Sequence, residues 1–253
     1  MDRGLYSATA AGLVADRQVQ VVSNNLANVN TVGFKGQRLT TKQQEFSDTL
    51  ASTIAGVPAR AQSDQEQTPG IVDTTTVTDF TPGSINFTGN ALNVALRDAN
   101  TFFVVQTPQG EAYTRAGNFS LNAERQLVTA DGLPLTGDGG VIALPPGKIS
   151  LNSTGTVTVD GSNIARLRIV SFEDPKSLER TEGVRFKAAA GAQPRIAENA
   201  EVVPESLEMP NVDTVTSMVD LITASKAFEA YTKSVRTIDE MNDRIIRNAR
   251  TTG

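Results

Sequence analysis

Apolar and small residues recur every seven positions at both ends of this 253-residue chain, and this repeat constrains the fold more than any other feature. In the N-terminal stretch the repeat occupies one row and a second row three positions later: Leu5, Gly12, Val19 and Leu26, then Ala8, Ala15, Val22 and Val29. Such rows predict a long amphipathic helix over residues 1–30, with a narrow seam suited to close helix pairing. An ordinary core helix is the alternative, although its apolar stripe is usually wider.

The C-terminal stretch, residues 206–253, carries the same repeat. Its rows are Leu221, Phe228, Val235 and Asn242, then Ala224, Tyr231, Ile238 and Ile245. A buried amide at a position such as Asn242 commonly fixes the register of paired helices. Either Asn211 or Asp213 is predicted to cap the start of this helix. We expect both terminal helices to form a coiled coil, either with each other or with neighbouring subunits.

Between the helices the period of the pattern changes from that of a helix to that of a strand. The stretch TFFVVQTPQGEAYTR predicts a strand, a turn around Pro108 and Gly110, and a second strand. FSLNAERQLVTADG predicts another pair, and VTVDGSNIARLRIVSF a third with its bend at Asp160-Gly161. Residues 81–205 are therefore expected to form an antiparallel β-rich domain, and the chain as a whole is predicted to be α+β.

Residues 31–80 show weak periodicity. Their segment ARAQSDQEQTPG is polar and is interrupted by Pro69-Gly70. We interpret this region as an extended arm that becomes ordered only against a partner. A flexible linker is the alternative that the composition leaves open.

Histidine and cysteine are both absent, which removes several kinds of chemistry. A cysteine nucleophile, a Ser-His pair, an imidazole base and a Cys/His zinc site are all excluded. The formal net charge is -5 and no basic stripe stands out, so no nucleic-acid partner is expected. No phosphate-binding loop occurs, and neither a cofactor, a metal nor a small-molecule substrate is expected. No apolar run has the form of a cleaved signal peptide or a membrane span.

Two other functions deserve comparison with a structural role. A glycoside hydrolase would need paired carboxylates, and acidic residues do occur in the β region: Asp98, Glu111, Glu124, Asp131 and Asp138. However, Asp131 and Asp138 each precede glycine in ordinary turn dipeptides, and nothing marks a pocket. A secreted adhesin-like binding module would need a ligand surface, but no aromatic cluster indicates one. Neither function is favoured.

Three motifs resemble those of the flagellar basal-body rod and hook proteins, in the same order along the chain. The first is SNNLANVNTVGFK, and the last is NVDTVTSMVDLITASKAFEAYTKSVRTIDEMN. Between them, LNVALRDANTFFVVQTPQGEAYTRAGNFSLNAERQLVTADGLPL resembles the start of the family's β domain, although RDANTFF lacks the glycines usual before the paired phenylalanines. The resemblance covers nearly the whole chain.

This resemblance implies a structural subunit and not an enzyme. Family members leave the cytoplasm through the flagellar type III export apparatus without a cleaved signal, and polymerise into the drive shaft that crosses the periplasm. Their terminal helices form an inner coiled-coil domain and their β domains an outer layer. The implied partners are copies of the chain, other rod proteins, the export apparatus and the ring proteins around the rod. The length and the opening MDRGLY favour the proximal rod, with a distal rod or hook-type subunit as the alternative.

The motif SNNLANVNTVGFKGQR places amides, a glycine and a phenylalanine directly after the helical repeat. Asn28 and Asn30 could cap the helix end, and Gly33 could take a positive φ to turn the chain outward. We expect Phe34 to contact a neighbouring subunit, or alternatively to lie under the arm of its own chain. The expected assembly interface comprises Leu5, Gly12, Val19, Val22, Asn24, Asn25, Leu26, Asn28, Gly33, Phe34, Leu221, Phe228, Tyr231, Val235, Ile238, Asn242 and Ile245.

Overall fold

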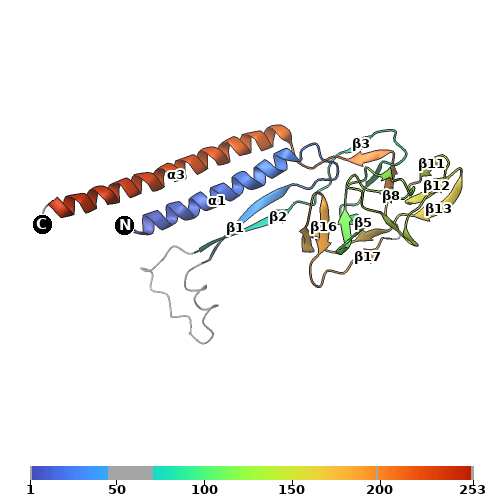
Figure 1. Cartoon of the computed structure of the whole chain (residues 1–253), viewed down its shortest axis with the longest axis horizontal. Helices are drawn as coiled ribbons and strands as arrows, with labels where there is room; N and C mark the ends of the chain where they lie inside the picture. The colour runs from blue at the N-terminus through green and yellow to red at the C-terminus, as the bar shows by residue number, and fades with distance from the viewer. Residues whose placement is uncertain (1, 45–70, 198, 252–253) are drawn as a thin grey trace, which may run out of the picture. The chain divides into compact units, whose positions relative to one another are not determined.

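The computed structural model describes residues 2–44, 71–197 and 199–251, and the chain divides into two compact units (Figure 1). The helical unit comprises Met1–Leu26, Gln37–Val77 and Thr214–Gly253. The β unit comprises Ala27–Gly36 and Thr78–Asp213. The chain therefore passes between the units at four places, which follow residues 26, 36, 77 and 213.

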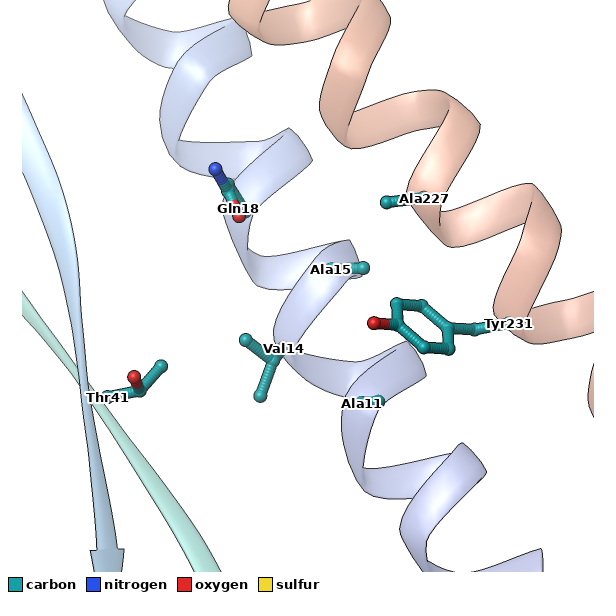
Figure 2. A pocket seen from close by; sticks show the side chains of 7 residues that line it. All are labelled: Ala11, Val14, Ala15, Gln18, Thr41, Ala227 and Tyr231. Carbon is teal, nitrogen blue, oxygen red and sulfur yellow. The ribbon is translucent and has the colours of Figure 1, made fainter.

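The helical unit contains the two long terminal helices and one pair of strands. Helix α1 spans Asp2–Ala27 and helix α3 spans Thr214–Thr251, so the two predicted terminal helices are confirmed. They lie side by side (Figures 1 and 2), and a Cβ atom on Gly12 would be 3.8 Å from the Cβ of Tyr231. Ala15 and Ala224 are both buried, as expected where small side chains let helix backbones approach. Their coiled-coil pairing stays a prediction.

The region predicted as an extended arm contains two strands of the helical unit. Strands β1 (Gln37–Gln44) and β2 (Ile71–Thr78) pair in a two-stranded sheet. Neither strand was expected from the weak periodicity of residues 31–80. Residues 45–70, which include the polar segment ARAQSDQEQTPG, lie outside the described residues. Whether the arm becomes ordered against a partner stays a prediction.

The β unit is built around a six-stranded sheet with the order β15-β16-β6-β5-β14-β17. Its strands are β5 (Thr101–Thr107), β6 (Gly110–Thr114), β14 (Ile169–Ser171), β15 (Leu178–Arg180), β16 (Arg185–Ala188) and β17 (Arg195–Ile196). Every pairing in this sheet is antiparallel, which confirms the predicted class of the central region. A short 3₁₀ helix, Pro175–Ser177, precedes β15.

Smaller sheets surround the central one. A three-stranded sheet contains β11 (Ile149–Leu151), β12 (Thr156–Val159) and β13 (Ser162–Arg166). The two-stranded pairs are β3 (Ile85–Phe87) with β19 (Ser206–Glu208), β4 (Val94–Leu96) with β18 (Val202–Pro204), β7 (Ser120–Leu121) with β8 (Leu127–Val128), and β9 (Thr136–Gly137) with β10 (Gly140–Val141).

The uninterrupted apolar run at the start of β5 follows from burial on both faces of the sheet. Successive side chains of a strand point to opposite faces. Phe103 and Val105 accordingly belong to one hydrophobic core, which extends over the three-stranded sheet, whereas Phe102 and Val104 belong to a second. The second core holds edge-to-face aromatic contacts, such as Tyr113 with Phe172 at 4.9 Å between ring centroids. These two cores are formed by residues 80–202 of the β unit.

The predicted hairpin turns are confirmed. Strands β5 and β6 are joined around Pro108, and Thr107 pairs with Gly110. Asp160 and Gly161 connect β12 to β13 with φ values of 50° and 83°, and this pair of positive angles belongs to the tight turns that Asp-Gly favours. Within the described residues, neither helix is long and apolar enough to cross a membrane.

Candidate functional site

The motif after α1 turns the chain sharply and then enters the β unit. Helix α1 ends at Ala27, and the backbone N–H of Thr31 donates to the carbonyl oxygen of Asn28 at 3.0 Å. The Thr31 hydroxyl also donates to Asn28 Oδ1 at 3.2 Å. Gly33 then adopts φ = 68°, so the positive φ predicted for it is confirmed. Asn28 thus stabilises the turn that follows the helix.

Residues 33–36, called here the docking segment, are all buried in the β unit. The N–H of Gly33 donates to the carbonyl oxygen of Glu208 at 2.9 Å, and the N–H of Gly36 donates to Asn211 Oδ1 at 2.7 Å. The carbonyl oxygen of Gly36 accepts from the N–H of Asp79 at 2.8 Å. The segment is therefore bonded to the stretch that follows β2 and to the stretch that precedes α3.

A buried ion cluster lies beside the docking segment. The Glu208 carboxylate binds Lys35 Nζ at 2.8 Å through Oε1 and Arg115 Nε at 2.7 Å through Oε2. It also accepts the N–H of Gly83 at 3.1 Å. No side chain of this trio is more than 1% exposed. The cations have further partners, since Lys35 Nζ donates to Thr81 O at 2.7 Å and Arg115 to backbone carbonyls of β4 and β5.

Burial and the neighbouring charges act in opposite directions on the pKa values of Glu208 and Lys35. Burial alone would raise the pKa of Glu208, but the charges and hydrogen bonds of Arg115 and then Lys35 outweigh it and hold that pKa below its usual range. Burial lowers the pKa of Lys35 and outweighs the attraction of Glu208, and the positive charge of Arg115 acts in the same direction. The two cations therefore favour the ionised form of Glu208, whereas burial disfavours the charged form of Lys35.

Phe34 is buried in its own chain, so the expectation that it contacts a neighbouring subunit is wrong. Its side chain is 1% exposed, and the guanidinium carbon of Arg180 lies 4.5 Å from its ring centroid. Arg180, on β15, also donates to the carbonyl oxygen of Lys35 and lies 5.5 Å from the ring centroid of Phe186. A cation of the β unit therefore stacks on the ring of Phe34. Burial lowers the pKa of Arg180 to about 10.

Two asparagines have roles that their sequence positions did not indicate. The side chain of Asn25 pairs with the backbone of Gln37, donating to its carbonyl oxygen at 2.8 Å and accepting its N–H at 2.9 Å. Asn211 joins Gly36 to the carbonyl oxygens of Asp79 and Thr81, at 2.8 and 3.1 Å. Its amide is therefore engaged in the β unit, although Asn211 was one of two residues predicted to cap α3.

The remaining residues of the predicted interface lie along the two helices. Half-buried side chains follow the heptad rows: Gly12, Val19, Val22, Leu26, Leu221, Val235 and Ile238. Phe228 and Tyr231 are each 39% exposed, and Asn24 is exposed. The side chains of Leu5, Asn242 and Ile245 lie outside the described residues. The structure places the rows on the helices, and their role in assembly stays a prediction.

An open cleft of the helical unit lies beside these rows. In Figure 2 the ring of Tyr231 points toward α1, where Ala11, Val14, Ala15 and Gln18 line the cleft. Ala227 of α3 and Thr41 of β1 complete its lining. The lining is uncharged and most of its side chains are small, which suits a packing surface.

A second apolar surface on α3 was missed by the sequence analysis. The exposed fractions of Val215, Met218, Val219 and Ile222 range from 49% to 69%. Their spacing by three and four positions was visible in the sequence and defines one helix face. The heptad rows lie on a different face of the same helix.

The ion cluster was also missed, because its members are far apart in the sequence. Lys35 and Glu208 are separated by 173 positions, and Arg115 and Glu208 by 93. Each is a single charged residue in its own segment, and no local pattern links it to the others. Among the described residues there is no group of three or more acidic, histidine or cysteine side chains placed to bind a metal ion.

Replacing Gly33 with alanine should weaken the docking of residues 33–36. A Cβ atom there would lie 2.3 Å from the backbone nitrogen of Ala116, and the positive φ alone costs about 1–2 kcal/mol. Gly132→Ala is the matched control, because φ is 79° there and a Cβ atom would have no neighbour within 4 Å. Thermal unfolding should show a clearly larger loss for Gly33→Ala. Equal losses would contradict the close packing of Gly33.

The chain is an α+β protein whose two long terminal helices belong to the same unit. Its β unit contains the docking segment and the buried ion cluster. Three family models match the chain: "Flagella basal body rod protein" over residues 5–35, "Flagellar hook protein FlgE/F/G D1 domain" over residues 98–159, and "Flagellar basal body rod FlgEFG protein C-terminal" over residues 203–248. The first match includes the docking segment up to Lys35, and the last includes Glu208 and Asn211.

Curated relatives match the chain nearly from end to end. The flagellar basal-body rod protein FlgG of Bacillus subtilis is 32% identical, with 97% of this chain and 98% of that protein covered. FlgF of Salmonella typhimurium is 31% identical, with 96% and 97% covered. FlgG of Caulobacter vibrioides is 33% identical, with 92% and 94% covered. The chain belongs to the flagellar basal-body rod protein family.

Proposed function

We propose that this chain is a structural subunit of the flagellar basal-body rod, polymerising into the drive shaft that transmits torque from motor to hook. One observation carries the proposal: rod proteins match the chain over almost its full length. A repeated heterologous contact builds an open filament, because the operation that relates neighbours does not close on itself. The rod crossing the periplasm is the proposed location.

The terminal helices are the proposed contact surfaces with copies of the chain and with other rod proteins. Their heptad rows are only partly covered within one chain, as the exposure of Phe228 and Tyr231 illustrates. The apolar face of Val215, Val219 and Ile222 adds a second surface on α3. Neighbouring helices could cover both surfaces, which would give the inner coiled-coil domain. The proposed domain ranges are 1–30, 31–80, 81–205 and 206–253, with the β domain outermost.

The chain is proposed not to be an enzyme. Of the acidic residues considered for glycoside cleavage, Glu111 is bound to Arg168 at 2.6 Å. Glu124, Asp131 and Asp138 are exposed on turns or short loops. The one fully buried acid of the β unit's ion cluster, Glu208, is held by two cations, which leaves it unsuited to proton transfer. The export apparatus and the rod-surrounding ring proteins are proposed as further partners.

Within the rod, a proximal position is proposed. The opening MDRGLY supports this position. Relatives named FlgF and FlgG both match over most of their length, so the choice between the two positions depends on this sequence feature. A distal or hook-type subunit is the alternative.

Deletion of the gene should abolish motility and remove the chain from isolated basal bodies, and complementation should restore both. Basal bodies from a strain without the distal rod subunit separate the two positions. A proximal subunit should still be incorporated there, whereas a distal or hook-type subunit should be absent. Normal swimming of the deletion strain would contradict a role in the rod.

A further inference from the structure

We infer that residues 33–36 form a releasable latch, which docks in a slot of the β unit and can leave it without unfolding the β unit's two hydrophobic cores. The slot is formed by residues 79–83, Arg115, Arg180 and residues 208–211. The inference depends on the contacts of one chain and is independent of any role in the rod.

The first argument is the kind of contact that holds the segment. Residues 33–36 belong to none of the described strands, and Phe34 belongs to neither hydrophobic core although it is 1% exposed. The contacts that hold the segment include backbone hydrogen bonds of Gly33 and Gly36, the Lys35–Glu208 ion pair and the stacking of Arg180 on Phe34. Both cores therefore keep all their members when the segment leaves.

The second argument is energetic balance. Taking two charges out of water offsets most of the attraction gained by a buried ion pair. Lys35 shares Glu208 with Arg115, which remains in the β unit and keeps the carboxylate compensated when Lys35 departs. Undocking consequently exposes Lys35 to water without leaving an unpaired buried acid. Local opening of this kind requires less free energy than global unfolding.

The third argument concerns what the latch connects. Residues 33–36 lie between α1 and β1, whereas Asp79 follows β2 and Asn211 precedes α3. The backbone of Gly36 and the side chain of Asn211 bond these stretches together. Docking therefore bonds together the three stretches of the β unit that adjoin the boundaries after residues 36, 77 and 213, and release would separate these stretches.

Native-state hydrogen exchange on the full, unaltered chain tests the latch directly. The reporters are the N–H groups of Gly33, Gly36 and Asp79, which bond within the slot. The reference amides are Leu127 and Leu135, which bond to Ile142 O and Leu127 O in the larger core. The reporters should exchange about 100-fold faster than the reference amides and depend less on denaturant. Equal protection with an equal denaturant slope would overturn the latch.

A variant pair sharpens the test. Lys35→Gln should speed exchange of the three reporters by at least about tenfold and leave Leu127 and Leu135 within about twofold of the unaltered chain. Lys42→Gln is the control, because Lys42 is exposed on β1, and it should leave all five amides unchanged. Uniform acceleration of reporters and reference amides by Lys35→Gln would show that the segment belongs to the core. If that variant fails to fold, the measurement on the unaltered chain still decides.

Discussion

Replacing Glu208 with alanine should lower the free energy of unfolding of the β unit by about 3–5 kcal/mol, the usual cost of breaking a buried ion pair. The substitution leaves Arg115, which is 0% exposed, without its carboxylate. It also removes the partner of Lys35 and the acceptor for the N–H of Gly83. Urea unfolding followed by circular dichroism measures the loss.

The chain supplies a matched control for this prediction. Glu201 also binds an arginine, Arg97, at 3.2 Å, but the side chains of that pair are 55% and 61% exposed. Because solvent screens an exposed pair, Glu201→Ala should cost under about 1 kcal/mol. Comparable small losses for both variants would mean that the Glu208 cluster contributes little to the stability of the β unit.

Aspartate at Leu26 or at Val235 should block incorporation into the rod and abolish motility while the β unit stays folded. Both side chains are half-buried on the heptad rows of their helices, and an unpaired carboxylate is costly on a surface that packing must cover. The measurements are swimming assays, blotting of isolated basal bodies and circular dichroism of the purified variants.

Ser234→Asp is the control for the seam, because Ser234 is exposed and, although it is the neighbour of Val235 in the sequence, lies on a different face of α3. It adds the same charge to the same helix and should be tolerated far better. Normal incorporation of both Leu26→Asp and Val235→Asp would contradict the assignment of the heptad rows to assembly. Loss of the folded β unit in these variants would instead show that the helices are required for its stability.

Local patterns in the sequence predicted the elements whose causes are local. The seven-residue rows predicted α1 and α3, and Asp160-Gly161 predicted the turn between β12 and β13. The run around Phe102 and Phe103 predicted a strand, and its lack of alternation is explained by cores on both faces.

The docking segment could not be predicted in the same way. Phe34 follows a helix and a turn, and nothing nearby in the sequence could cover it, so contact with another subunit was the natural hypothesis. Arg180, which stacks on its ring, lies almost 150 positions later. Lys35, Arg115 and Glu208 likewise acquire a role only when distant segments meet. The motif was correctly singled out, but the partners of its buried side chains are defined by tertiary structure.

The four passages of the chain between the helical unit and the β unit also determine how the molecule responds to cutting. A protease that cleaves the backbone at any one passage leaves the two units joined covalently through the remaining ones. Neither unit can be excised as a single fragment, and neither can be transplanted into another protein as one continuous gene segment. Removal of either unit from the molecule would thus require several cuts.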